Sequence, residues 1–140
     1  MLFTFEVLGR PSSKGRPRFS TYGNYVKTYT PPKTVEYENL VRLSYTQSGG
    51  KKWNGIISAN IIAYFPIPKS VSKKKRQAML YTAYDKKPDC DNIAKIILDA
   101  LNGIAYDDDS QVTSLSVSKE YAEDPKVVVT FAMFDNLQEE

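Results

Sequence analysis

Five aspartates flank one predicted helix and give this sequence its most specific chemistry. Asp89 and Asp91 lie where the helix begins, and Asp107, Asp108 and Asp109 follow after it has ended. Because the chain between them is short, we expect the two groups to fold into one acidic cluster. Carboxylate oxygens are hard ligands, and a site of carboxylates and water suits Mg²⁺ or Mn²⁺. A metal ion held in this way can activate water for cleavage of a phosphodiester.

The amino-acid composition excludes most other hydrolytic mechanisms. The 140 residues include no histidine and a single cysteine. Ser-His-Asp, Cys-His and His-ligated zinc sites are therefore impossible, and the chemistry must use carboxylates, Lys, Tyr or a metal-bound water. A lone cysteine forms no internal disulfide, which fits a cytoplasmic protein. No apolar run approaches the roughly 20 residues of a membrane span, so we expect no membrane partner.

The charge is divided unevenly along the chain. Residues 1–87 contain sixteen Lys and Arg against four Asp and Glu, whereas residues 88–140 contain three against twelve. A basic half favours a polyphosphate partner such as DNA, and the acidic half can hold the metal. The alternative is that both halves are ordinary solvated surfaces whose charges balance to a net +3.

One α+β domain spanning residues 1–140, with a mixed sheet and about three helices, is expected to position these groups. Alternating and β-branched residues predict strands, and Gly- and Pro-rich stretches predict the connections. The predicted elements are a strand at 2–8, a loop at 9–19, a small hairpin or an irregular extended segment at 21–28, a helix at 33–48, a strand at 56–65, a Lys-rich helix at 72–81, a helix at 91–102 and a closing hairpin at 112–119 and 127–134.

The helix at 91–102 is the clearest of these elements. Its apolar residues recur with the spacing of one buried stripe, which contains Ile93, Ile96, Ile97, Ala100 and Leu101. Asp91, Lys95 and Asp99 fall on the opposite arc. The helix at 33–48 is predicted to turn four residues toward the core, namely Val35, Leu40, Val41 and Leu43.

Each charged group around this helix also has a purely structural interpretation. Asp89 before an apolar-periodic run is a standard N-cap, and Asp91 in the first turn favours the helix dipole. Lys95 can form an i,i+4 ion pair with Asp91, and the run at 107–109 can be a solvated turn. One cap does not require the whole Asp-x-Asp-Asn set, so we favour a metal site in which Lys95 stabilises charge in the transition state.

Three motifs surround the helix: Pro88-Asp89-x-Asp91-Asn92-x-x-Lys95, Asp99-Ala100-Leu101-Asn102-Gly103 and Asp108-Asp109-Ser110-Gln111-Val112. Together they resemble the RusA family of Holliday-junction resolvases. Residues 11–18 also resemble the basic loop of phage-borne members, which leaves a host or a prophage origin open.

This resemblance implies a homodimeric, Mg²⁺-dependent endodeoxyribonuclease that cuts four-way junction DNA. It implies that Asp89, Asp91 and Asp109 are the essential carboxylates and metal ligands. Lys95 matches the family's catalytic lysine. Asp108 matches the acidic neighbour of the third carboxylate and is a weaker candidate ligand, while Asp107 is an addition to the family pattern.

Ten basic residues are candidates for contact with the DNA. They are Arg10, Lys14, Arg16 and Arg18 in the Gly/Pro-rich loop, Lys73, Lys74, Lys75 and Arg76 in a predicted helix, and Lys86 and Lys87 directly before the carboxylates. Arg and Lys can contact phosphates, and tyrosines close behind the loop can stack on unpaired bases. The alternative is a solvated loop and a solvated helix face.

We therefore expect a structure-selective endodeoxyribonuclease that resolves Holliday junctions by paired nicks in DNA recombination and repair. Two alternatives remain open from the sequence. One is a Mg²⁺-dependent nuclease that acts on flaps or duplex DNA with the same site. The other is a non-catalytic nucleic-acid-binding protein whose acidic helix start is structural.

Overall fold

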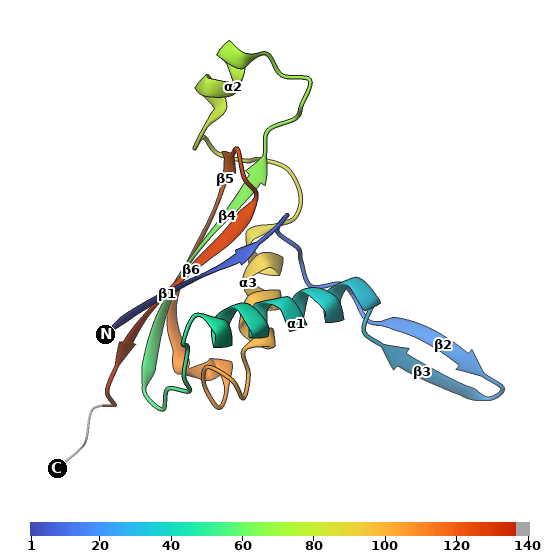
Figure 1. The fold of residues 1–140 in the computed structure, drawn as a ribbon. Coiled ribbons are helices and arrows are strands. Elements are labelled where there is room, and N and C mark those ends of the chain that lie inside the picture. The colour runs from blue at the N-terminus through green and yellow to red at the C-terminus, as the bar shows by residue number, and fades with distance from the viewer. Residues whose placement is uncertain (137–140) are drawn as a thin grey trace.

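The computed structural model describes residues 1–136, apart from the side chain of Tyr22. Its strands and helices are β1 (Leu2–Leu8), β2 (Arg18–Tyr22), β3 (Tyr25–Tyr29), α1 (Pro32–Gln47), β4 (Ile56–Pro66), α2 (Lys73–Met79), α3 (Cys90–Ala100), a short 3₁₀ helix at Asp109–Gln111, β5 (Val112–Ala122) and β6 (Lys126–Phe134). Helices α1 and α3 lie on one side of the main sheet, and α2 lies beyond one of its ends (Figure 1). The expected α+β domain with a mixed sheet and three helices is confirmed.

The main sheet has the strand order β1-β6-β4-β5, and this order corrects the predicted closing hairpin. β6 lies between β1 and β4 and is antiparallel to both, whereas β5 pairs in parallel with β4. β5 and β6 are therefore consecutive strands that do not pair with each other. The apolar residues of β6 suit a central position, and β5, whose outward positions include Ser114, Ser116 and Ser118, takes the edge.

The core lies between the sheet and the helices α1 and α3. Every residue of the predicted α3 stripe is fully buried: Ile93, Ile96, Ile97, Ala100 and Leu101. They face alternate residues of β4 and β6, which are buried at every second position. The apolar face of α3, with its 3.6-residue period, thus packs on the apolar faces of the strands, with their two-residue period, as the sequence predicts.

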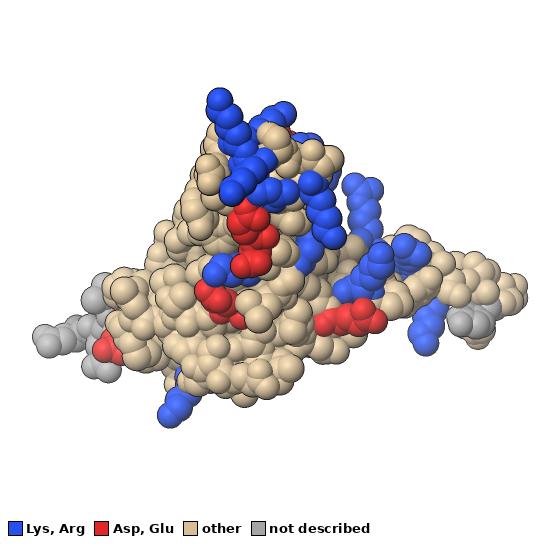
Figure 2. Space-filling view, turned by 45° about the horizontal axis from the view of Figure 1, so that its top comes forward, with Lys and Arg blue, Asp and Glu red and all other residues tan. Residues whose placement is uncertain are grey.

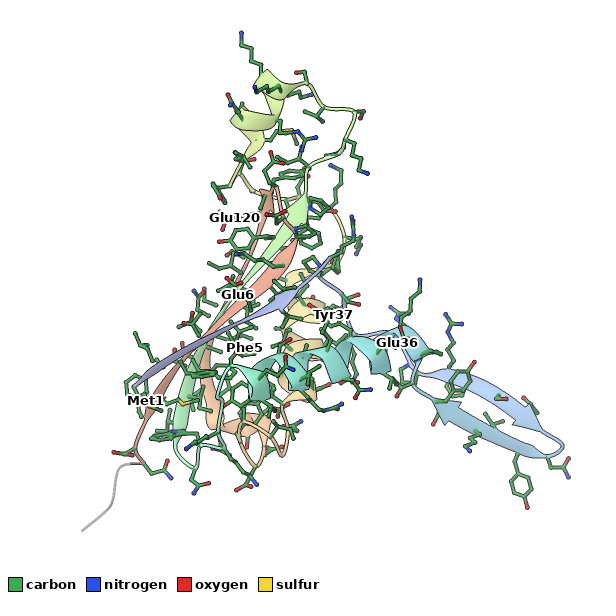
Figure 3. All side chains as sticks on the ribbon, in the orientation of Figure 1. Met1, Phe5, Glu6, Glu36, Tyr37 and Glu120 are labelled. Carbon is green, nitrogen blue, oxygen red and sulfur yellow. The ribbon has the colours of Figure 1, made fainter. Side chains whose placement is uncertain are left out.

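The predicted inner face of α1 is wrong at three of its four positions. Val35, Leu40 and Leu43 are 42%, 38% and 53% exposed, and Val41 is buried as predicted. The buried residues are Thr34, Tyr37, Glu38, Val41 and Tyr45, which follow the i, i+3, i+4 spacing in polar and aromatic residues. Figure 3 shows Tyr37 on the side of α1 that faces β1. Tyr and Glu can bury the carbon atoms of their side chains, so a prediction from hydropathy alone selected the wrong face of α1.

Strands β2 and β3 form a separate two-stranded hairpin that extends away from the rest of the molecule (Figures 1 and 3). The predicted hairpin at 21–28 is confirmed, but its strands are longer, so Arg18 lies on a strand and not in the preceding loop. Large apolar side chains on it are exposed, including Phe19 at 71% and Tyr25 at 78%.

Two further observations concern helix ends and membrane association. Ser72 caps α2, since its hydroxyl accepts a hydrogen bond from the backbone N–H of Lys75 at 3.3 Å. Gly103, after the end of α3, has a φ of +80°, a conformation that glycine adopts without strain. None of the helices within residues 1–136 has the length and apolar character needed to cross a bilayer.

Candidate active site

Asp89 lies at the N-cap position of α3 but does not cap the helix with its side chain. Its backbone is extended, at φ −72° and ψ 153°, and its carboxylate forms no cap hydrogen bond. The carboxylate oxygens instead accept from Lys87 Nζ at 3.0 and 3.1 Å in an exposed ion pair. Asp91 is exposed in the first turn of the helix. The capping interpretation of Asp89 is therefore wrong for its side chain, and both carboxylates face solvent at the helix start.

Lys119, which the sequence did not single out as a site residue, holds the loop before Asp89. Its ammonium donates hydrogen bonds to the carbonyl oxygens of Lys86 at 2.7 Å and Pro88 at 2.9 Å. The buried Tyr84 adds a long hydrogen bond from its hydroxyl to the carbonyl of Lys87 at 3.4 Å. No local signal identifies Lys119, because it lies on β5, about thirty residues further along the chain, in an ordinary alternating strand.

The triplet at 107–109 divides into two structural aspartates and one without a partner. Asp107 forms an ion pair with Lys52. Asp108 caps the 3₁₀ helix by accepting from the backbone N–H of Ser110 at 3.2 Å. The side chain of Ser110 first, and then its backbone N–H, lower the pKa of the Asp108 carboxyl by hydrogen bonding. Within residues 1–136, no hydrogen bond or ion pair engages the half-buried carboxylate of Asp109. Asp109 is thus the member of the triplet that is left available for another ligand.

Gln111 fixes the position of this triplet. Its side-chain oxygen accepts from the backbone N–H groups of Asp107 at 2.9 Å and Asp108 at 3.4 Å. Its side-chain nitrogen donates to the carbonyls of Trp53 at 2.8 Å and Gly55 at 2.9 Å. One glutamine therefore ties the triplet to the start of β4, which explains why it follows the aspartates so closely.

The structure does not bring the predicted carboxylates together within one chain. Among residues 1–136, no three Asp, Glu or Cys side chains form a group able to hold a metal ion. Asp109 lies near the C-terminal half of α3: the hydroxyl of the buried Tyr106 donates to the carbonyl of Leu98 at 2.6 Å. Burial first, and then the negative charges of Asp109 and Asp99, raise the pKa of Tyr106. Leu98 lies seven residues beyond Asp91, about 10 Å along the helix axis, and Asp109 joins Asp89 and Asp91 in no metal-binding group among residues 1–136.

Lys95 lies between these two acidic ends of α3 and is exposed. The ion pairs among residues 1–136 do not include Lys95, so the expected alternative of an i,i+4 pair with Asp91 is wrong. Its ammonium is therefore free to contact a ligand on the surface that carries Asp91.

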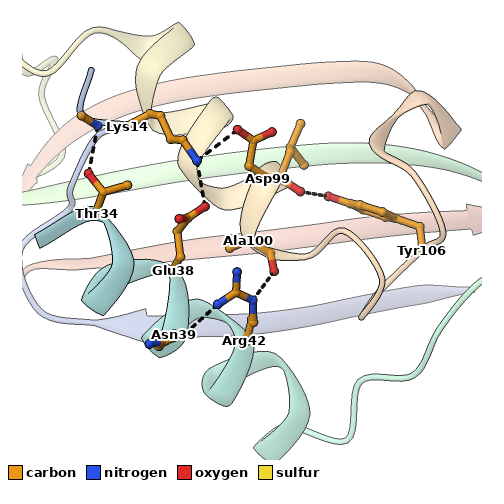
Figure 4. A network of polar contacts seen from close by, with 10 residues as sticks. Lys14, Thr34, Glu38, Asn39, Arg42, Asp99, Ala100 and Tyr106 are labelled. Carbon is orange, nitrogen blue, oxygen red and sulfur yellow. Dashed lines mark hydrogen bonds and ion pairs between the residues drawn. The ribbon is translucent and has the colours of Figure 1, made fainter. Parts of the chain in front are cut away.

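Lys14 anchors the basic loop to both helices (Figure 4). Its ammonium lies 3.0 Å from Glu38 on α1 and 3.4 Å from Asp99 on α3. Its backbone N–H donates to the carbonyl of Asn92 at 3.4 Å, and the backbone N–H of the next residue, Gly15, donates to Thr34 at 3.0 Å. Of the four basic residues predicted in this loop to contact DNA, Lys14 is thus held by carboxylates, whereas Arg10, Arg16 and Arg18 are exposed.

The remaining basic candidates differ in how far their charges are compensated. Lys73, Lys74 and Lys75 are exposed on α2, while Arg76 bonds to Glu123 at 3.3 Å and to the carbonyl of Pro68 at 2.9 Å. Figure 2 shows carboxylates along the middle of one face, with lysine and arginine side chains gathered above them and to their right. The face that displays the acidic groups is therefore bordered by positive charge, as a surface that binds a polyanion requires.

Comparisons with known proteins agree with this arrangement. Residues 9–132 match the family model described as "Endodeoxyribonuclease RusA". The chain is also 39% identical over 130 residues to YqaN of Bacillus subtilis (strain 168), an uncharacterised protein, with 89% of this chain and 92% of that protein covered. The matched region contains both acidic groups, Lys95 and most of the basic surface. This chain belongs to the RusA family of endodeoxyribonucleases.

Proposed function

We propose that this protein is a divalent-metal-dependent endonuclease that resolves four-way DNA junctions by paired nicks. The observation that supports it most directly is the availability of three aspartates. Asp89 does not cap its helix, Asp91 is exposed, and Asp109 has no partner among residues 1–136, while the neighbours of Asp109 are engaged in structure. A protein that only binds nucleic acid has no use for a cluster of exposed carboxylates on its DNA-facing surface, because they repel phosphate.

The donor atoms fit Mg²⁺ or Mn²⁺ in kind, since all three side chains offer hard oxygen ligands. A bound ion would supply a Lewis acid and an activated water. Asp89, Asp91 and Asp109 would hold it, and Lys95, free of other partners, would stabilise negative charge on the phosphate. Asp108 serves the fold as a cap, so we assign it no ligand role.

We further propose that the active form is a homodimer. Within residues 1–136, one chain does not gather Asp109 with Asp89 and Asp91 into a metal-binding group, so a complete metal site needs ligands from outside that chain. Phosphate oxygens of the DNA and the carboxylates of a second copy are the two available sources. Two copies would also supply the two nicks that a junction with two-fold symmetry requires.

The decisive experiment measures nicking of a synthetic four-way junction, a flap and a linear duplex, each with Mg²⁺ and with EDTA. We expect Mg²⁺-dependent nicks in opposed strands of the junction and much slower cleavage of the other two DNAs. Equal cleavage of flap or duplex would establish the alternative nuclease activity. Tight binding without any metal-dependent turnover would establish the non-catalytic alternative.

The aspartate triplet provides matched controls for this assay. Asp109→Asn should reduce single-turnover nicking about 100-fold or more, which corresponds to roughly 2.7 kcal/mol. Asp108→Asn should stay near wild type, since asparagine caps about as well as aspartate. Asp107→Asn removes an exposed ion pair with Lys52 and should also have little effect. An equal loss in all three variants would show that the net charge matters and not one ligand.

A further inference from the structure

A pocket of about 630 Å³ opens beside the candidate active site and has no role in the mechanism above. It lies between the end of β4, helix α2 and the loop that precedes α3. Its apolar and aromatic lining consists of Pro66, Ile67, Pro68, Tyr84 and Tyr121. Its volume falls within the range of roughly 300–1,000 Å³ that is typical of small-molecule sites.

The aromatic wall of this pocket is rigid. Tyr84 stacks on Phe65, with ring centroids 3.9 Å apart and an angle of 4° between the planes, and Tyr121 packs edge-on against Tyr84 at 5.1 Å. Both tyrosines are buried. A wall packed in this way exists before any ligand arrives, so little ordering is required on binding.

The charged lining of the pocket is strongly positive. Four cations, Arg10, Lys69, Arg76 and Lys86, face a single carboxylate, Glu123, which bonds to Arg76. Arg10 and Lys86 instead contact neutral hydroxyls, Arg10 with Tyr84 at 3.4 Å and Lys86 with Tyr121 at 3.0 Å. Lys86 also lies 4.0 Å from the exposed carboxylate of Asp85. The pocket therefore suits an occupant with both an apolar surface and a negative charge.

The pocket adjoins the aspartates along the chain. Lys86 in its lining precedes Asp89 by three residues, which span at most about 10 Å of extended chain. Lys119 fixes the segment between them through the carbonyls of Lys86 and Pro88. One DNA strand can therefore contact both Asp89 and the lining of the pocket.

We propose that this pocket receives one nucleotide turned out of the DNA beside the scissile phosphate. Its base would lie against the prolines, Ile67 and the tyrosines, and its phosphate would face Arg10 and Lys86. A base can reach such a pocket only by leaving its stack, and it leaves most easily where pairing is already weak, as at the exchange point of a junction. The proposal rests on the proposed function in taking DNA as the ligand and in placing the cut phosphate at Asp89, and it gives a structural basis for preferring branched DNA.

The test scans single positions around the exchange point of a fixed junction and measures binding in Ca²⁺ or EDTA. At one position, removing the base should weaken wild-type binding about tenfold. A mismatch at that position should strengthen binding several-fold, because the base is easier to extrude. Wild-type binding that responds equally, or not at all, to both changes at every position would overturn the proposal.

Two variants link the effect to the pocket. Pro68→Trp fills the pocket from an exposed position without changing charge, and Gln47→Trp adds the same bulk at an exposed site on α1. Only Pro68→Trp should abolish the difference between normal, abasic and mismatched junctions, with melting temperatures confirming that both variants fold. If Pro68→Trp fails to fold, Lys86→Ala against Lys51→Ala repeats the comparison. A folded pocket variant that keeps the full base dependence would refute the assignment.

A free deoxynucleotide has the same base and phosphate groups and is the alternative occupant of the pocket. Calorimetric titration with dTMP distinguishes it: we expect no saturable binding below about 1 mM, since most of the binding free energy comes from the surrounding DNA. Saturable dTMP binding that Pro68→Trp abolishes, without base dependence on the junction, would assign the pocket to a free nucleotide instead. All these readouts are of binding, so failure of metal-dependent nicking would count against the proposed nuclease function alone.

Discussion

Lys119→Met tests whether the lysine that holds the loop before Asp89 also supports catalysis. The substitution keeps an apolar stem of similar length and removes two hydrogen bonds from an ammonium to backbone carbonyls, at 2.7 and 2.9 Å. Hydrogen bonds from a charged group contribute about 1.5–3 kcal/mol each when buried. Because both carbonyls can be rehydrated at the surface of this half-buried site, we expect a total loss of about 2 kcal/mol. For a chain of this size, that loss lowers the melting temperature by about 6 °C.

The effect on catalysis follows from the position of the loop. With the carbonyls of Lys86 and Pro88 released, Asp89 no longer has a fixed place, and small misplacements of a reacting group can cost up to about 100-fold in rate. We expect single-turnover nicking at saturating enzyme to fall about tenfold, well below the melting temperature. Lys119→Arg keeps the charge with a different geometry and should recover activity only in part.

A control on β6, the next strand along the chain, separates this effect from the loss of any surface lysine. Lys126→Met removes an ion pair with Glu6 on the open face of the sheet, at 3.1 Å, and should change neither nicking nor stability appreciably. If Lys119→Met lowers stability as expected but nicks at the wild-type rate, the lysine supports the fold alone. An unchanged melting temperature and an unchanged rate would refute the reasoning altogether.

The remaining predictions concern the aspartates and the basic surface. Asp91→Asn should abolish cleavage and leave junction binding intact or tighter, because it removes a metal ligand and a repulsive charge; wild-type turnover would restore the helix-dipole interpretation. Mixing inactive Asp91→Asn with inactive Asp109→Asn should restore nicking if the metal site is shared between two copies, since half of the sites in mixed dimers are then intact, whereas sites built within one chain would stay inactive. Lys95→Ala should lower single-turnover nicking about 100-fold with little change in binding, and a rate within about threefold of wild type would remove it from the mechanism. Replacing Arg16 and Arg18 by Ala should weaken junction binding and reduce the log–log salt slope by roughly 0.9 for each DNA phosphate that the protein no longer neutralises, measured by titration at several salt concentrations.

Local sequence patterns were sufficient for much of the fold. The stripe from Ile93 to Leu101 predicted α3 and its buried face, and alternation predicted the strands, because burial on one side of a regular element imposes a period on the residues themselves. On α1 the same reasoning failed, since Tyr37, Glu38 and Tyr45 are buried while Val35 and Leu43 are exposed. A hydropathy scale ranks tyrosine and glutamate below valine and leucine, although the carbon atoms of their side chains can also pack in a core.

The sequence by itself limited the chemistry that is possible here: without histidine, hydrolysis must use carboxylates, Lys, Tyr or a metal-bound water. The motif around Asp89 and Asp91 could be identified because its residues are neighbours on one helix. The tertiary structure decided which groups are available. In the folded chain, Asp107, Asp108 and Lys14 form ion pairs or hydrogen bonds, whereas Asp109 and Lys95 have no partners among residues 1–136. Lys119 lies against the loop before Asp89. The fold also places β6 between β1 and β4 and, within residues 1–136, does not gather Asp109 with Asp89 and Asp91 into a metal-binding group. These features depend on contacts between residues far apart in the chain. Such contacts leave no periodic pattern in the local sequence, because their free energy depends on how the whole chain packs.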